Sequence, residues 1–239
     1  MKNTINYQIN KYWLIIPASG IGARIKSNIP KQYIKLTSGK TILDTTLEKF
    51  INIKKIAGFI VAIDKKDNFF SESKYINHKK LLTTVYGDNK RFISVLNAVR
   101  ALDKWANDND WVLVHDACRP CISERLVLNL INNLKNEKVG GLLATPVVDT
   151  IKKAGDFDYV AKTVDRNNLY QAQTPQMYRF WIIKKALEEV INNKLTITDE
   201  TQAVEHLGLK AKIVKSDTRN IKITHPEDID LANFYLMKK

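Results

Sequence analysis

The sequence predicts an α/β fold built on a mostly parallel sheet. Apolar runs typical of strands recur along the chain, at residues 12–16, 56–63, 81–86, 111–115 and 141–148. Between some of these runs the apolar residues follow the i, i+3, i+4 spacing of a helix that lays one face on a sheet. This alternation of strands and helices indicates parallel pairing, because a parallel connection needs a crossover. A later stretch breaks the alternation and predicts a hairpin arm outside the sheet.

The first strand ends in a glycine-rich turn. Residues 12–16 run into Pro17-Ala-Ser-Gly-Ile-Gly-Ala-Arg24, and Pro30-Lys-Gln-Tyr33 follows. Small residues let a backbone approach an anion closely, and Arg24 and Lys31 add full positive charge. The P-loop sequence G-x-x-x-x-G-K-[ST] is absent, and the third glycine of a dinucleotide fingerprint is missing. The turn therefore predicts a triphosphate site for nucleotidyl transfer, and a tight turn without a ligand is the structural alternative.

The next elements bring a second glycine to the end of a strand. A helix over residues 43–50 precedes the second strand, and the third strand ends at Gly87-Asp-Asn-Lys-Arg-Phe-Ile-Ser94. Arg91 and Ser94 open the helix whose apolar stripe covers residues 92–102. Ligands of open α/β sheets bind at the carboxyl ends of strands. We therefore expect this segment to contact a ribose, a base or a phosphate.

The strand at 111–115 is followed directly by Asp116 and Arg119. A carboxylate in this place can hold Mg²⁺ on a triphosphate, and the arginine can pair with a second phosphate. The structural alternative is that Asp116 only caps the next turn. His115 is expected to pack at the end of the strand, because phosphoryl chemistry here has no evident need of a general base.

Residues 149–176 depart from the α/β alternation. The segments 150–153 and 159–164 predict two short strands that face each other across a polar turn at 155–158. A two-stranded hairpin cannot bury both of its faces alone, so this arm should pack on a partner subunit or on the site. The chain then returns to the α/β pattern and ends in an amphipathic helix that begins at Pro226.

The composition suits a globular protein of 239 residues, 44% of them hydrophobic. We expect a polar N-terminal tail over residues 1–11 and a single domain over 12–239. No apolar run approaches the ~18 residues of a membrane span, and the first ten residues are too polar for a signal peptide. These features predict a cytoplasmic protein without a membrane partner. Cys118 and Cys121 have no second cysteine pair with which to hold zinc, so we expect two reduced thiols.

The formal net charge of +13 raises the question of a nucleic-acid partner. Its lysines come as dispersed doublets, such as Lys54-Lys55 and Lys184-Lys185, without interleaved aromatic residues. A stacking platform for nucleic acid would need that interleaving. We therefore expect solvated faces and no nucleic-acid partner, in a field that also favours small acidic substrates.

Eight ordered motifs together resemble the 2-C-methyl-D-erythritol 4-phosphate cytidylyltransferases of the non-mevalonate isoprenoid pathway. The resemblance runs from about Trp13 to the C-terminus. The motifs are Pro17-Ala-Ser-Gly-x-Gly-x-Arg24, Pro30-Lys-Gln-Tyr33, Val114-His-Asp-Ala-x-Arg-Pro120, Asp149-Thr150, Thr163-Val-Asp-Arg166, Gln173-Thr-Pro-Gln176, Thr198-Asp-Glu200 and Asn220-Ile-Lys222. The resemblance implies a Rossmann-like nucleotidyltransferase fold with a dimerising arm, a homodimer, CTP as co-substrate, Mg²⁺ as cofactor and pyrophosphate as co-product.

The resemblance also implies roles for individual residues. Arg24 and Lys31 resemble the catalytic groups that stabilise the transition state. The positions that resemble contacts to methylerythritol phosphate are Arg166, Lys222, Thr150, Arg119 and Thr198. The positions expected around CTP are Pro17, Ala18, Ser19, Gly20, Gly22, Gly87, Asp88, Arg91, Ser94, Asp116 and Ala117, with Asp116 also as the metal ligand.

One departure from the family pattern and two alternatives remain open at this point. Relatives usually carry Gly-Gly where this chain has Gly87-Asp88, which puts a backbone conformation that needs glycine in doubt. A cytidylyltransferase for ribitol 5-phosphate or a similar polyol phosphate would share several motifs, although Thr163-Val-Asp-Arg166 and Thr198-Asp-Glu-Thr201 favour the erythritol enzyme. A non-catalytic nucleotide-binding or RNA-binding protein is the alternative of a different class, and Arg24, Lys31 and Asp116 argue against it.

Overall fold

The central sheet contains seven strands in the order β3-β2-β1-β4-β8-β5-β9. The computed structural model describes residues 10–20, 25 and 28–238, so residues 1–9 of the predicted tail lie outside the described part. The strands are β1 (Tyr12–Pro17), β2 (Ile56–Ile63), β3 (Leu81–Tyr86), β4 (Trp111–Val114), β5 (Gly140–Pro146), β8 (Tyr170–Arg179) and β9 (Lys212–Lys215). β8 runs antiparallel to β4 and β5, whereas the other pairs are parallel. The predicted α/β fold with a mostly parallel sheet is confirmed.

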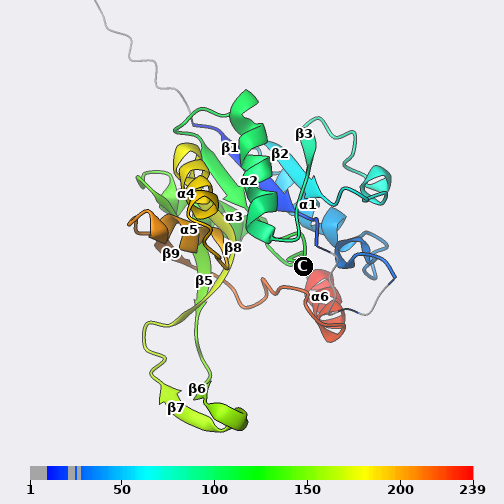
Figure 1. Cartoon of the computed structure of the whole chain (residues 1–239). Helices are drawn as coiled ribbons and strands as arrows, with labels where there is room; N and C mark the ends of the chain where they lie inside the picture. Colours follow the sequence, from blue (N-terminus) through cyan, green and yellow to red (C-terminus); the bar gives the residue numbers. More distant parts are fainter. Residues whose placement is uncertain (1–9, 21–24, 26–27, 239) are drawn as a thin grey trace, which may run out of the picture.

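Helices cover both faces of this sheet (Figure 1). They are α1 (Ile42–Ile51), α2 (Arg91–Ala101), α3 (Glu124–Leu134), α4 (Phe180–Asn192), α5 (Glu200–His206) and α6 (Glu227–Met237), with short 3₁₀ turns η1 (Lys31–Tyr33), η2 (Phe70–Glu72), η3 (Leu102–Lys104) and η4 (Asp156–Asp158). The hydroxyl of Thr41 accepts a hydrogen bond from the backbone N–H of Asp44 and so caps the start of α1. Ser123 caps α3 in the same way. None of the helices in the described ranges is long and apolar enough to cross a membrane.

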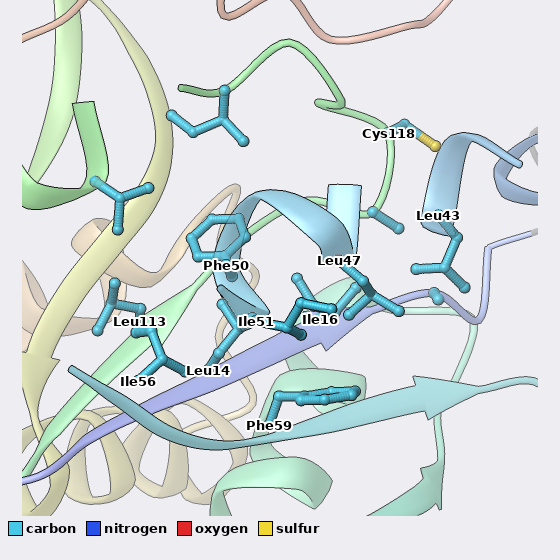
Figure 2. Close-up of a cluster of buried hydrophobic side chains, with 14 of the residues drawn as sticks. Leu14, Ile16, Leu43, Leu47, Phe50, Ile51, Ile56, Phe59, Leu113 and Cys118 are labelled. Carbon is cyan, nitrogen blue, oxygen red and sulfur yellow. The ribbon is translucent and has the colours of Figure 1, made fainter. Parts of the chain in front are cut away.

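The core consists of two clusters, one on each face of the sheet. Along β1, Leu14 and Ile16 belong to the cluster under α1 and α3, while Trp13 and Ile15 belong to the cluster under α2 and α4. Figure 2 shows Leu14 and Ile16 close to Phe50 of α1. Because side chains alternate between the faces of a strand, an uninterrupted apolar run is what a strand covered on both faces requires.

The arm consists of β6 (Ile151–Ala154) and β7 (Val160–Val164), which pair antiparallel in a separate two-stranded sheet. It extends away from the main sheet beyond the end of β5 (Figure 1). The predicted hairpin is present, but its predicted range, about 149–176, overlaps the main sheet. From Tyr170 the chain pairs with β5 as part of β8. The arm itself therefore ends before that point.

Candidate active site

Three strands bring their carboxyl ends to one edge of the sheet. β1 ends at Pro17, β3 at Tyr86 and β4 at Val114. Because β2 and β4 flank β1 on opposite sides, the strand order reverses there, and such a reversal opens a crevice for ligands. A cavity of about 360 Å³ lies at this edge. It brings together ten predicted site residues: Pro17, Ala18, Ser19, Gly20, Lys31, Asp88, Arg91, Asp116, Ala117 and Lys222.

Asp116 lies at the centre of the positive charges in this cavity. Its Oδ1 is 2.9 Å from Nε of Arg91, and its Oδ2 is 2.9 Å from Nζ of Lys222 and 3.6 Å from Nε of Arg119. Burial alone would raise the pKa of the Asp116 carboxyl, but the charges of Arg91, Lys222 and Arg119 hold that pKa well below its usual range. The carboxylate therefore stays ionised and fixes three cations that converge from different parts of the sequence.

The loop before α6 orients Arg119 and one further cation, Lys31. Nζ of Lys31 donates to the carbonyl oxygen of Ile223 at 2.8 Å, and Nη1 of Arg119 donates to the carbonyl oxygen of Asn220 at 2.7 Å. Asn220 is fully buried, and its side-chain amide donates to Oε1 of Gln173 and to the carbonyl oxygen of Thr174. The segment that carries Lys222 is thus tied to β8, which explains how a residue near the C-terminus reaches the glycine-rich turn.

Gln32 holds the backbone of the glycine-rich turn through a hydrogen bond. Gln32 was not assigned a role from the sequence. It is buried, lines the cavity, and donates from Nε2 to the carbonyl oxygen of Ala18 at 2.6 Å. The backbone N–H of Ala18 donates to the carbonyl oxygen of Ala62 on β2. The sequence feature that could have indicated this role is the position of Gln32 next to Lys31 in Pro30-Lys-Gln-Tyr33.

The predicted cradle from Gly87 to Ser94 forms around two hydroxyl groups. The hydroxyls of Ser19 and Ser94 lie 2.8 Å apart, and the hydroxyl of Ser94 accepts from the backbone N–H of Asp88. A β-carbon at position 87 would lie 2.4 Å from Oγ of Ser19, so only glycine fits there. Asp88, in contrast, is not among the described residues with positive φ. The expected difficulty of placing aspartate after Gly87 is therefore absent from this backbone.

Glu200 is a second residue that the sequence did not single out. It is fully buried at the start of α5, and its Oε1 accepts from Nη1 of Arg91 at 2.5 Å. Burial raises the pKa of the Glu200 carboxyl, and the charge of Arg91 opposes that rise. Glu200 stands in the motif Thr198-Asp-Glu200, but nothing in the sequence indicates that its carboxylate contacts Arg91 of α2.

Several predicted site residues lie elsewhere. Arg24 and Gly22 fall outside the described residues. Thr150 and Arg166 belong to the arm, where Nη1 of Arg166 donates to the carbonyl oxygen of Val148. Thr198 lines a different cavity, of about 390 Å³, beside β5, β8 and α5. The structure of one chain therefore does not bring these three described residues to the cavity of Asp116.

Thr198 and Asp199 directly precede α5. The side chain of Asp199 accepts from the backbone N–H of Gln202, and Oε1 of Gln202 accepts from the backbone N–H of Thr198. Asp199 therefore caps α5, and the return bond from Gln202 goes to Thr198 rather than to Asp199 itself.

His115 and the two cysteines are inert, as their sequence context suggested. Burial lowers the pKa of His115 to about 3, and its Nδ1 lies 3.0 Å from Oγ1 of Thr174. Cys118 and Cys121 form no disulfide. Burial raises the pKa of each thiol to about 11, so neither is a thiolate near neutral pH. These groups supply packing rather than reactivity.

Comparisons with known proteins agree with this geometry. Residues 12–238 match the family model of 2-C-methyl-D-erythritol 4-phosphate cytidylyltransferase. The chain is 54% identical over 236 residues to the 2-C-methyl-D-erythritol 4-phosphate cytidylyltransferase of Vesicomyosocius okutanii subsp. Calyptogena okutanii (strain HA), covering 95% of this chain and 97% of that protein. It is also similar to the crystal structure of the enzyme of that name from Francisella tularensis, with a TM-score of 0.83 and 39% identity over 95% of this chain and all of that one.

Proposed function

Since the chain belongs to the 2-C-methyl-D-erythritol 4-phosphate cytidylyltransferase family, it transfers CMP from CTP to 2-C-methyl-D-erythritol 4-phosphate, and we propose that the transfer takes place in the cavity around Asp116. The products are 4-diphosphocytidyl-2-C-methyl-D-erythritol and pyrophosphate. Family membership decides for this activity over the ribitol 5-phosphate and non-catalytic alternatives. The observation that carries the assignment of the cavity is the convergence of Lys31, Lys222 and Arg91 beside a glycine-rich turn.

The triphosphate of CTP lies along the glycine-rich turn, with its oxygens facing the cations of the cavity. Ser19 and Asp88 line the same cavity, and the hydroxyl of Ser94 contacts both of them beside Gly87; this uncharged or acidic group suits the cytidine part better than the phosphates. This assignment follows from charge, because phosphate oxygens are stabilised by fixed cations and backbone N–H groups.

The reaction is an in-line displacement at the α-phosphorus. A phosphate oxygen of methylerythritol phosphate forms the new P–O bond, and the bond to the bridging oxygen of the β-phosphate breaks, so pyrophosphate leaves with that electron pair. Negative charge on the equatorial and leaving oxygens rises in the transition state. Lys31 and Arg24 stabilise that charge, and Lys222 and Arg119 hold the attacking phosphate nearby.

Mg²⁺ is the proposed cofactor, and the donor set of the cavity suits it. The cavity offers the ionised carboxylate of Asp116. Among residues 10–20, 25 and 28–238 no group of three or more His, Cys, Asp or Glu residues could hold a metal by itself. Such a site matches Mg²⁺, which commonly binds through one or two carboxylates and completes its shell with substrate phosphates and water. When bound, the ion would neutralise charge on the triphosphate.

We assign Arg166 and Thr150 to the methylerythritol phosphate site of a neighbouring chain. Thr150 directly precedes β6 and Arg166 follows β7 by two residues, and neither lines the cavity of Asp116. The arm carries exposed apolar side chains, with Phe157 93%, Tyr159 77% and Val160 62% exposed. Thr198 would join this substrate site from the start of α5. A homodimer that pairs through the arms would cover the apolar surface and complete each site.

The arm is expected to hold two chains together in solution. Burial of Tyr159 and Val160 against a second copy would remove apolar surface from water, which favours a dimer at micromolar concentration. Light scattering coupled to size-exclusion chromatography measures the mass. A Tyr159→Asp, Val160→Asp variant should shift the mass toward the monomer, and a wild-type monomer at micromolar concentration would refute the pairing.

Arg166→Lys should raise the KM for methylerythritol phosphate about tenfold and change the KM for CTP little. A lysine keeps the charge but cannot reproduce the bidentate fork of a guanidinium on a phosphate. Steady-state kinetics with each substrate varied in turn measures both constants. Co-expression of Arg166→Lys with Arg24→Ala should restore partial activity, because a hybrid dimer has one site with both native residues. A mutant that changes only the CTP constant would contradict the assignment.

The cell compartment is part of this proposal. A cytoplasmic location suits an enzyme that consumes CTP and carries two unpaired cysteines.

A further inference from the structure

Glu200 has an unusual environment for a buried carboxylate. Its side chain has no exposed surface, and its Oε1 accepts from Nη1 of Arg91 at 2.5 Å. Its Oε2 is buried and has no hydrogen-bond partner among the described residues. Burying a carboxylate with one oxygen unpaired costs free energy, and an apolar residue of similar size would avoid that cost. Packing alone therefore does not explain why a carboxylate occupies this position.

The orientation of Glu200 is fixed by its neighbours on both sides. Nε2 of Gln176 donates to Oδ2 of Asp199, and Oε1 of Gln176 accepts from the backbone N–H and the hydroxyl of Thr201. Tyr178 adds a hydrogen bond of 2.6 Å to the hydroxyl of Thr201. One side chain of β8 thus holds the residues before and after Glu200, and the Glu200 carboxylate points at Arg91 of α2.

Arg91 connects this buried carboxylate with the cavity. Its Nε donates to Oδ1 of Asp116 at 2.9 Å while its Nη1 donates to Glu200, and its side chain lines the cavity. The hydrogen bonds that the guanidinium makes within the described part come from Nε and Nη1. We propose that Glu200 is a positioning residue that acts through Arg91, keeping one edge of the guanidinium turned toward CTP. This inference rests on the proposed place of Arg91 beside CTP.

The geometry of the guanidinium explains how Glu200 would act. A guanidinium with a single carboxylate partner prefers a parallel, two-bond contact that uses two of its nitrogens. Without Glu200, Arg91 would turn its outer nitrogens onto Asp116 and lose the donor that faces CTP. It would also compete with Lys222 for Oδ2 of Asp116. With Glu200 present, Nε of Arg91 binds Asp116 and Nη1 binds Glu200, and the third nitrogen, Nη2, is left for the ligand.

The test is a double-mutant cycle between Glu200→Gln and Arg91→Gln. Glu200→Gln keeps the shape and removes the charge, and it should raise the KM for CTP about tenfold while the KM for methylerythritol phosphate stays within twofold. The Kd for CTP, measured by calorimetry without the second substrate, should rise by the same factor. In the Arg91→Gln background, Glu200→Gln should cause no further change, because its effect requires Arg91.

Glu48→Gln is the matched control, since Glu48 also pairs with a cation, Lys40, at 2.7 Å but lies outside the cavity. It should leave all constants unchanged. An unchanged KM for CTP in Glu200→Gln, a parallel rise of both KM values, or an additional loss in the Arg91→Gln background would each overturn the inference. If Arg91→Gln itself leaves CTP binding unchanged, the proposed place of Arg91 is what fails.

Arg91→Lys covers the case in which Glu200→Gln does not fold. A lysine keeps the positive charge but cannot bridge Asp116 and Glu200 while presenting a third donor. It should raise the KM for CTP and leave the KM for methylerythritol phosphate within twofold. Unchanged CTP binding in this variant would overturn the inference as well.

Discussion

Lys31→Ala is expected to lower turnover by about 10² to 10³-fold without unfolding the protein. Lys31 lies on η1 beside the glycine-rich turn, where Nζ is held by the carbonyl oxygen of Ile223. This bond fixes the ammonium group before substrate arrives, so its charge is already in place when charge develops on the phosphate oxygens. Removing the group takes away transition-state stabilisation, whereas the structure loses only one hydrogen bond.

Single-turnover and steady-state kinetics together with a thermal melt test this expectation. The kcat should fall while the Tm changes by a few degrees at most. Lys35→Ala is the control, since Lys35 is an exposed lysine four residues further along and does not line the cavity. Arg24→Ala should resemble Lys31→Ala, on the strength of the sequence motif. Wild-type turnover in Lys31→Ala would remove Lys31 from the reaction.

Asp116→Asn should reduce turnover by about 10²-fold and also destabilise the fold. A neutral amide keeps the shape but cannot hold a hard cation, and it places an N–H group against positively charged neighbours. Arg91, Arg119 and Lys222 would then repel one another without a counterion. Losing one partner of a buried ion pair costs about 3 kcal/mol at the lower end of the usual range.

Activity measured across a Mg²⁺ titration separates the loss of a metal ligand from the loss of the counterion for the three cations. Urea denaturation gives the free energy of unfolding. A requirement for more Mg²⁺ indicates a metal ligand, while an unchanged requirement with reduced kcat indicates that Asp116 only holds the cations. Asp103→Asn removes a carboxylate from an exposed ion pair with Lys184 and should change neither quantity. Full activity of Asp116→Asn with an unchanged Mg²⁺ requirement would show that the residue is no ligand.

The parallel half of the sheet was predictable because both of its faces are covered. Strands β1, β2 and β4 are nearly continuous apolar runs, and the turns after β1, β3 and β4 carry the glycines and charges that a ligand needs. The site at their carboxyl ends follows from that topology. Lys31, Asp116 and Lys222 were found in this way, since each stands out as a polar group beside an apolar element or in a motif.

β8 was harder to predict because its buried positions are polar. Gln173, Thr174 and Gln176 are all buried in this strand, and hydrogen bonds to Asn220, Asp116 and Asp199 satisfy them. No hydrophobic alternation reveals such a strand. The same network positions Glu200 against Arg91. These two residues are 109 positions apart, so no local sequence pattern indicates their contact. Thr150 and Arg166 do not line the cavity of Asp116, and no pattern along the sequence indicates which site the arm reaches.

The two unreactive thiols have a practical consequence for spectroscopy. The protein contains only two cysteines, and with pKa values of about 11 both are poor nucleophiles toward maleimide or iodoacetamide at pH 7. A third cysteine introduced at Lys153, an exposed polar position on β6 of the arm, would therefore be labelled selectively by brief treatment without removing the native ones. Spin labels or fluorophores at that position would report the separation between two arms, or between an arm and a bound nucleotide analogue, in an otherwise unmodified enzyme.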